Sequence, residues 1–273
     1  MEPSQDARDE RAEAPARTPH TAASVRTAAE EFLRLLDECD VPDADGYFQK
    51  HPSSQYFAGL IEDQPGAWDA VVRNMLFGLD RFPDGRVVDV GCGHGLQSFV
   101  FARHGLEVVG LDTAEHRTVV SNRIAEAADM PWLTYRTGNA RTEVAKERCS
   151  AVWMHRSFHH IPDKRDWDAS AVQYFQQIHG ALEPGGVVVF TTSNATGRSL
   201  VPGVSRGQHK AGHIAQLLEQ ADFEVTDIVY RGYLSGLPLR IRPRNVAAID
   251  ARLAQVPGIR KLGGGLTFAA RRR

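Results

Sequence analysis

Three alternating glycines follow a run of β-branched residues and precede an apolar stretch of helical length. Residues 87–90 read Val-Val-Asp-Val, and Gly91, Gly93 and Gly95 come next at a spacing of two. Glycines at a strand-to-helix turn let the backbone approach a ligand closely, and the helix N-terminus offers unpaired N–H groups to a negative group. The segment predicts a binding loop for a polar or anionic ligand, although a purely structural turn could carry the same glycines.

A carboxylate ends the next predicted strand. Asp112 closes the run Gly-Leu-Asp and would lie beside the glycine turn, where it could accept hydrogen bonds from a ribose diol. Leu96 stands where the dinucleotide fingerprint places its third glycine, which disfavours NAD and FAD. Asp112 would also suit the cap of the following helix. Together with the glycine turn, it favours a nucleoside ligand.

Two adjacent histidines, His159 and His160, follow a predicted strand at 151–155. The ordinary pKa of histidine lies near neutrality, so both are candidates for a general base. Either ring could instead pack or hydrogen-bond a neighbouring loop. His155 and His159 are spaced as a metal pair that Asp163 could complete, but the segment contains a proline and lacks an H-E-x-x-H context, so no metal is predicted.

From residue 83 onward, short β-branched runs alternate with amphipathic segments, which predicts an α/β fold with a doubly wound parallel sheet. The expected strands cover 86–90, 107–111, 133–137, 151–155, 186–192, 224–230 and 266–271. The expected helices cover 96–104, 117–127, 169–182 and 211–220. Each helix is a plausible right-handed crossover, and ligands of such sheets bind at the carboxyl ends of the strands.

The chain before this sheet divides into a tail and a helical cap. Residues 1–21 contain no large aliphatic side chain, so we expect a disordered tail. Apolar residues recur at intervals of three and four in 22–36 and again from 66 or 67 to 79, which predicts two helices. An N-terminal helical cap would then occupy 22–82, and the sheet domain 83–273.

Aromatic residues in the cap could wall an apolar acceptor pocket, or they could simply cover the edge of the sheet. They are Tyr47, Phe48, Tyr56, Phe57 and Trp68.

A locally basic insertion is expected at about 231–264. Its charged residues are Arg231, Arg240, Arg242, Arg244, Arg252, Arg260 and Lys261, against the single acidic Asp250. Arginines bind phosphate or carboxylate bidentately, which suggests an anionic acceptor, with Arg231 near the substrate, or an anionic lipid surface. A solvated arginine-rich face is the alternative.

Charge and composition exclude several classes of protein. The 32 Lys and Arg are balanced by 34 Asp and Glu, for a net charge of -2, so nucleic acid is not an expected partner. No apolar run approaches the ~20 residues of a membrane span. Three widely spaced cysteines and the lack of a secretory signal predict a cytoplasmic protein. An exposed cap helix could pair across a homodimer.

Four segments in order resemble the motifs of class I S-adenosylmethionine-dependent methyltransferases. They are Val-Val-Asp-Val-Gly-Cys-Gly-His-Gly from residue 87, the strand end at Asp112, Gly-Asn-Ala from residue 138, and Leu-Glu-Pro-Gly-Gly from residue 182. The run Ser-Phe-His-His-Ile-Pro-Asp from residue 157 is similar to the small-molecule branch that includes ubiquinone and menaquinone methyltransferases. The resemblance is clear over 86–186 and implies a seven-stranded Rossmann-like sheet.

The resemblance also implies a role for each matching residue. The methionine end of S-adenosylmethionine would be held by Asp89, Gly91, Cys92, Gly93 and Gly95; the ribose by Asp112 and Thr113; the adenine by Asn139 and Ala140; and the sulfonium end would lie near His155. The family more often has Asp at the position of Asn139. The amide oxygen of Asn can still accept a hydrogen bond, so we expect an altered adenine contact without loss of binding.

The expected function is therefore methyl transfer from S-adenosylmethionine to a small molecule, in biosynthesis of a specialised metabolite, with oxygen, nitrogen or carbon as the acceptor atom. Positioning supplies most of the rate of such a transfer, and a base such as His159 or His160 is needed only where the acceptor must lose a proton. An enzyme of the same fold that performs a cyclisation or decarboxylation is the main alternative. A non-catalytic binding module is disfavoured by the intact glycine turn and Asp112.

Overall fold

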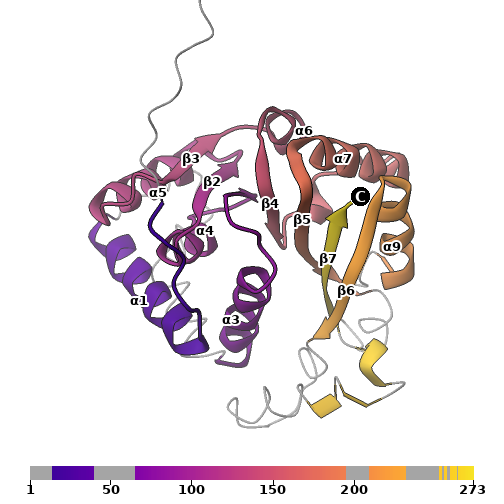
Figure 1. The fold of residues 1–273 in the computed structure, drawn as a ribbon, viewed down its shortest axis with the longest axis horizontal. Helices are drawn as coiled ribbons and strands as arrows, with labels where there is room; N and C mark the ends of the chain where they lie inside the picture. The colour runs from indigo at the N-terminus through magenta and orange to yellow at the C-terminus, as the bar shows by residue number, and fades with distance from the viewer. Residues whose placement is uncertain are drawn as a thin grey trace, which may run out of the picture.

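The computed structural model describes residues 14–39, 65–194 and 209–231, and toward the C-terminus 252–253, 255–256, 259–262 and 264–273. Seven strands form one sheet in the order β3-β2-β1-β4-β5-β7-β6 (Figure 1). Their bounds are β1 Arg86–Val90, β2 Glu107–Asp112, β3 Leu133–Thr137, β4 Cys149–His155, β5 Leu182–Ser193, β6 Phe223–Arg231 and β7 Gly265–Arg272. The predicted seven-stranded α/β sheet is confirmed.

The sheet reverses its strand order beside β1. The chain runs outward from β1 to β2 and β3, and β4 then returns to pair with the other side of β1. A crevice forms outside the carboxyl ends of the strands at such a reversal. Val90 and Leu111 are register partners near the ends of β1 and β2, so the turns that follow these two strands start side by side.

The last strand departs from the parallel arrangement expected from the sequence. β7 pairs antiparallel with both β5 and β6, and it lies between them. The alternation of β-branched residues within a strand does not encode the direction of that strand, so the sequence pattern did not distinguish an antiparallel last strand. The sheet is therefore mixed, and β6 forms its edge.

Helices cover both faces of the sheet. One face packs against α1 Ala22–Glu38, α3 Pro65–Leu79, α4 Leu96–Arg103 and α5 Glu115–Ala127, and the other against α7 Trp167–Ala181 and α9 Ala211–Gln220 (Figure 1). Neighbouring residues of a strand face opposite layers: Val87 joins the first core cluster and Val88 the second. No helix in the described part of the chain is both long and apolar enough to cross a membrane.

The two predicted cap helices are α1 and α3, and they pack directly on the sheet domain. Phe32 of α1 lies edge-on to Phe99 of α4, with ring centroids 5.6 Å apart. Trp68 of α3 is 4% exposed and belongs to the same core cluster. Its indole therefore covers the sheet, the plainer of the two roles considered for it. The cap is an added helical layer, continuous with the core.

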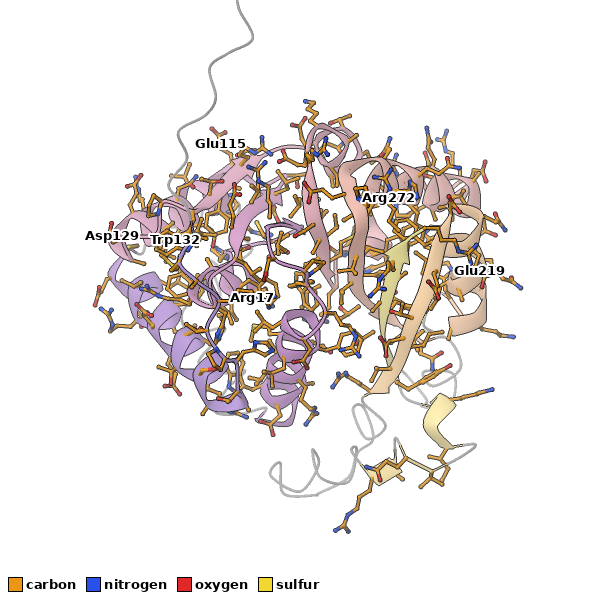
Figure 2. All side chains as sticks on the ribbon, viewed as in Figure 1. Arg17, Glu115, Asp129, Trp132, Glu219 and Arg272 are labelled. Atoms are coloured by element: carbon orange, nitrogen blue, oxygen red, sulfur yellow. The ribbon has the colours of Figure 1, made fainter. Side chains whose placement is uncertain are left out.

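Residues 14–21 differ from the expected disordered tail. They run extended along the surface before α1, and the Arg17 guanidinium donates hydrogen bonds to the carbonyls of Leu79 and Phe82 at 2.8 and 2.7 Å (Figure 2). Hydrogen bonds to the last carbonyl of α3 and to a carbonyl just beyond it fix this segment without any aliphatic anchor, which is why composition did not reveal it. Residues 1–13 lie outside the described part of the chain.

The observed bounds of helices and strands differ from the predicted ones mainly at polar turns. β5 begins at Leu182, so the Leu-Glu-Pro-Gly-Gly segment that was expected to precede the strand is its first part. The pairing of this part with β4 is irregular, with a register shift between Cys149 and Ala151. Four short elements were not predicted: α6 Ala140–Glu143, and the 3₁₀ turns η1 Val144–Lys146, η2 Phe158–His160 and η3 Ile259–Leu262. Two of them, α6 and η2, border the candidate site.

Candidate active site

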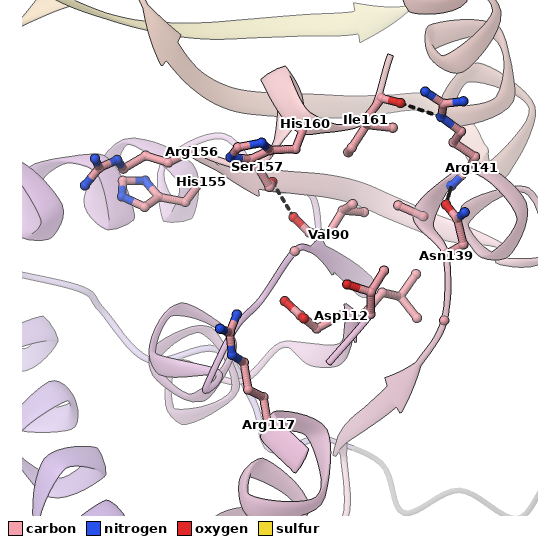
Figure 3. Close-up of a pocket in the computed structure, with 15 residues that line it drawn as sticks. Val90, Asp112, Arg117, Asn139, Arg141, His155, Arg156, Ser157, His160 and Ile161 are labelled. Carbon is pink, nitrogen blue, oxygen red and sulfur yellow. Dashed lines mark hydrogen bonds between the residues drawn. The ribbon is translucent and has the colours of Figure 1, made fainter. Parts of the chain in front are cut away.

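A cavity of about 570 Å³ opens at the carboxyl ends of β1, β2 and β4. Seven of its lining residues were predicted from the sequence: Gly91, Asp112, Thr113, Asn139, Ala140, His155 and His160. Eight more were not assigned a role: Val90, Leu111, Arg117, Gly138, Arg141, Arg156, Ser157 and Ile161. The cavity thus gathers residues from four separate turns of the chain (Figure 3).

The glycine turn is held by backbone hydrogen bonds to the neighbouring strand. The N–H groups of Gly91 and Cys92 both donate to the Leu111 carbonyl, at 2.7 and 3.2 Å. Gly91, Gly93 and Gly95 all have positive φ, at 73°, 59° and 84°. This left-handed conformation costs other residues energy, so the turn requires glycine for its path.

Tyr135 of β3 packs beneath the turn and explains two of the glycines. Its hydroxyl donates to the Gly95 carbonyl at 3.0 Å. A Cβ on Gly95 would lie 2.3 Å from that hydroxyl, and one on Gly110 would lie 2.4 Å from the same ring. By contrast, a Cβ on Gly93 would meet nothing within 4 Å. Packing against Tyr135 therefore requires glycine at position 95, whereas the space beside Gly93 is open.

The Asp112 carboxylate joins the glycine turn to the next helix. Its Oδ2 accepts from the Gly93 N–H at 2.9 Å, and its Oδ1 accepts from the Ala114 N–H at 2.9 Å. Each carboxylate oxygen has two acceptor sites, so one per oxygen remains for a ligand. Asp112 lies two residues before Ala114, the N-cap residue of α5, and α5 has no side-chain cap hydrogen bond, so the capping alternative is not observed, whereas the carboxylate lines the cavity.

Asp89 and Cys92 lie beneath the turn, outside the set of residues that line the cavity. Asp89 is 1% exposed and accepts a hydrogen bond from the Ser98 hydroxyl at 2.6 Å. Burial raises the pKa of its carboxyl to about 7. Burial also raises the pKa of the Cys92 thiol well above its ordinary value. In this structure Asp89 supports the turn from below through α4.

The Asn139 side chain caps α6 at the far end of the cavity. Its Oδ1 accepts from the Arg141 N–H at 3.0 Å, and the Arg141 guanidinium donates to the Ile161 carbonyl (Figure 3). The amide oxygen that was expected to face an adenine is therefore shared with the backbone of α6. Ala140 and Ile161 complete a partly apolar end that suits a flat ring.

His155 ends β4 on the opposite side of the cavity. Its ring is stacked on Trp153 at a centroid distance of 6.0 Å, and its Nδ1 lies 3.4 Å from Thr191 Oγ1. Burial, and secondarily the positive charge of Arg156, lowers the pKa of His155 to about 4. The imidazole is therefore neutral at physiological pH.

The two histidines proposed as bases differ in position. His160 lines the cavity, and the ring of His159 is packed against it at 3.8 Å, outside the set of lining residues. Ser157 begins the turn that carries both: its hydroxyl donates to the Val90 carbonyl at 2.6 Å. This contact brings the β4 turn against the glycine turn.

The predicted substrate residues are not brought to the cavity by the described structure. Tyr47, Phe48, Tyr56 and Phe57 lie outside the described residues. Arg231 ends β6, at the sheet edge, and does not belong to the cavity lining. Most of the basic insertion at 231–264 also lies outside the described part of the chain. No group of three or more His, Cys, Asp or Glu among the described residues could hold a metal ion, so His155, His159 and Asp163 do not form one.

Three arginines, Arg117, Arg141 and Arg156, are the main residues that sequence reasoning missed. Each lies within five residues of a predicted site residue, at the carboxyl end of β2, β3 or β4. Their proximity to those strand ends was a usable signal. The direction of a long side chain at a turn, however, depends on backbone dihedral angles that residue types alone did not specify.

Comparison with known proteins identifies the family of the chain. Residues 60–228 match the methyltransferase domain family. The chain is 32% identical over 144 residues to the ubiquinone biosynthesis O-methyltransferase of Ruegeria pomeroyi, covering 50% of this chain and 54% of that protein. The chain spans about half the length of the curated relatives it matches.

Solved structures share the fold at low identity. The N-methyltransferase NodS from Bradyrhizobium japonicum WM9, in complex with S-adenosylhomocysteine, aligns with a TM-score of 0.54 at 13% identity, over 89% of this chain and 98% of that one. The [4+2]-cyclase SpnF aligns with a TM-score of 0.52 at 17% identity, over 96% and 99%. The family match covers more than half of the sequence. This chain belongs to the methyltransferase domain family, whose class I members use S-adenosylmethionine.

Proposed function

We propose that the chain binds S-adenosylmethionine in the cavity and transfers its methyl group to a small molecule. The observation that carries this proposal is the hydrogen bond between the Gly93 N–H and Asp112, at the point where the β1 and β2 turns meet. It holds an open glycine turn and a carboxylate on one wall, the pair of groups that a ribose joined to an amino acid requires.

The residues present fit this cofactor. The open space beside Gly93 would admit an amino-acid portion, and the remaining acceptor sites of Asp112 could accept hydrogen bonds from the two ribose hydroxyls. Ala140 and Ile161 border the place for the adenine, with Asn139 beside it. When bound, S-adenosylmethionine supplies an electrophilic methyl group on a positively charged sulfur. The protein then needs to align the acceptor atom and exclude water.

His160 is the residue we propose as general base, because it lines the cavity next to the β4 turn. His159 would hold the His160 ring in place through their tilted ring contact. A base is required where the acceptor atom is a hydroxyl, and the related proteins from ubiquinone biosynthesis are named O-methyltransferases. Oxygen is therefore the acceptor atom we favour. His160→Gln should lower kcat about a hundredfold or more; an unchanged kcat and pH profile would remove this role.

We also propose an acidic acceptor from specialised metabolism, on the basis of the basic residues at 231–261 and the arginines that line the cavity. The near-neutral net charge of -2 argues against nucleic acid as the substrate. The free cysteines Cys39, Cys92 and Cys149 fit the reducing cytoplasm that we expect for this protein. A homodimer remains our expectation, to be tested by analytical ultracentrifugation.

Isothermal titration with S-adenosylhomocysteine, followed by transfer of a labelled methyl group into fractionated metabolites, tests the proposed function. We expect saturable binding and label in at least one small molecule. A protein without saturable affinity for S-adenosylhomocysteine would overturn the proposal. Tight binding without label in any metabolite would favour the alternative, a non-methylating enzyme of this fold; the cyclase SpnF is a structural neighbour.

A further inference from the structure

Arg156 and His155 lie together at one end of the cavity, away from Asn139 and Asp112 (Figure 3), and the sulfonium end of the cofactor is expected near His155. Figure 3 shows both side chains on one side, with Asn139 and Arg141 on the other and Asp112 between. Both residues come from the carboxyl end of β4. A methyl acceptor must enter beyond the nucleoside, so this end is the one available to it.

The backbone of Arg156 adopts a conformation that its residue type does not favour. Its φ is 58°, in the left-handed region, where glycine or asparagine is the usual residue. The Arg156 N–H donates to Thr191 Oγ1 of β5 at 2.9 Å, which helps to hold this conformation. Strained residues of this kind cluster at functional sites. Because the turn itself does not call for arginine, the guanidinium is the feature that needs a reason.

No carboxylate pairs with the Arg156 guanidinium among the described residues. Other arginines do pair with carboxylates, such as Arg86 with Glu107 at 2.7 Å and Arg103 with Glu31. Arg156 is exposed and lines the cavity. Asp112 is the one acidic residue in that lining, and its two oxygens already accept backbone N–H groups. The positive charge of Arg156 therefore remains available to a ligand.

The imidazole of the neighbouring His155 carries no charge of its own. His155 is neutral, because burial and the adjacent Arg156 lower its pKa to about 4. Its Nδ1 faces Thr191 Oγ1, the same hydroxyl oxygen that accepts from the Arg156 backbone. Thr191 thus holds both residues in place. A guanidinium carried on a held backbone, beside a neutral ring, suits an oxyanion, which arginine binds bidentately.

We propose that Arg156 binds an oxyanion, a carboxylate or a phosphate, carried by the methyl acceptor. This inference rests on the proposed function, and it assigns the recognition of an acidic acceptor to the β4 turn, whereas the sequence had pointed to the basic insertion. Arg156 would orient the acceptor without taking part in proton transfer.

The test uses the full chain saturated with S-adenosylhomocysteine. Benzoate, phenyl phosphate and the neutral benzamide are titrated as probes, and ligand-observed NMR measures their dissociation constants. We expect at least one of the two anions to bind about tenfold or more tightly than benzamide. The tighter anion identifies the acidic group as a carboxylate or a phosphate. Anions that bind no better than benzamide would overturn the proposal.

Variants distinguish the effect of the Arg156 side chain from that of the strained backbone of the turn. R156Q should reduce anion binding to the level of benzamide, R156K should give an intermediate loss, and R165Q, at an exposed position outside the cavity lining, should behave as wild type. R156G relieves the backbone strain, so it should lose anion binding while keeping at least wild-type stability. Full anion binding by R156Q or R156G would also overturn the proposal.

Affinity for S-adenosylhomocysteine is measured first for every variant. A wild-type protein that does not bind S-adenosylhomocysteine would refute the proposed function itself. Retained affinity without preference for anions would refute only the role of Arg156.

Discussion

The two ends of the cavity are built in different ways. At the glycine turn, hydrogen bonds join the ends of β1, β2 and β3: the Gly91 N–H donates to the Leu111 carbonyl, the Gly93 N–H to the Asp112 carboxylate, and the Tyr135 hydroxyl to the Gly95 carbonyl. At the end of β4, long side chains project from a turn in which Arg156 has a strained backbone. The Thr191 hydroxyl oxygen contacts both the Arg156 N–H and His155 Nδ1. The first end is a packed part of the core, whereas the second is a set of side chains placed on its edge.

This difference has a physical consequence. A substitution in the packed end changes stability and ligand affinity together, since the groups that bind also hold the strands. A substitution of a side chain that lines the cavity at the β4 end should change recognition with little change in stability. The two ends therefore suit different tasks: a cofactor shared by a family can be bound by backbone, while an acceptor that differs between members needs exchangeable side chains.

The largest expected effect comes from Gly95→Ala. The new Cβ would lie 2.3 Å from the Tyr135 hydroxyl, on a residue whose φ is 84°. Left-handed strain and overpacking each cost about 1–3 kcal/mol, so we expect a loss of about 3 kcal/mol in the free energy of unfolding, measured in urea. Gly212→Ala, in α9 with open space around it, is the control and should be neutral or slightly stabilising. Equal effects of the two changes would contradict the packed-end description.

The second prediction concerns Asp89 and pH. Its folded pKa of about 7 lies above the ordinary value of 3.8, so the folded state holds a proton that the unfolded state has released between these values. Its contribution to stability is therefore complete below pH 4 and is lost as the pH rises through 7, at up to about 1.4 kcal/mol per pH unit.

Asp89→Asn removes this titration while keeping an oxygen for the Ser98 hydroxyl. Relative to wild type, the variant should become more stable as the pH is raised from 5 to 8. Urea unfolding at both pH values measures the change. Parallel pH profiles for the two proteins would show that the Asp89 carboxyl does not carry the dependence.

A third change, Asp112→Asn, acts on binding within the packed end. Both carboxylate oxygens accept backbone N–H groups, so an amide nitrogen in place of one oxygen would face a donor. We expect the affinity for S-adenosylhomocysteine to fall about tenfold to a hundredfold, as measured by isothermal titration. Asp166→Asn, at an exposed helix start without a side-chain cap, serves as control. If Asp112→Asn bound S-adenosylhomocysteine as tightly as the wild type, Asp112 would not be a cofactor-binding residue.

The smallest effect is expected for Thr191→Val at the other end. The change removes the oxygen that accepts from the Arg156 N–H and lies near His155 Nδ1. One lost hydrogen bond at a buried site predicts a decrease of about 1–2 kcal/mol in unfolding free energy, with unaltered affinity for S-adenosylhomocysteine. A large loss of cofactor affinity would show that the two ends are coupled.

Much of the fold was predictable because its signals are local. The strands at 86–90 and 133–137 and the helix at 211–220 match the structure residue for residue, since β-branched runs and apolar periodicity set them directly. The direction of β7 and the contacts of Arg17 were not predictable. Arg17 contacts residues more than 60 positions away, and β7 pairs with β5 as well as with the nearer β6, so both features depend on contacts about which local patterns carry no information.

The sequence by itself determined the glycine turn, the carboxylate at Asp112 and the order of the strands that place them at one edge of a sheet. These features follow from backbone conformation and periodicity, which are properties of short segments. Only the tertiary structure separated the buried Asp89 from the cavity, put His160 on its wall with His159 behind it, and gathered Arg117, Arg141 and Arg156 around it. Burial and side-chain direction are set by the packing of distant elements, so they belong to the folded chain as a whole.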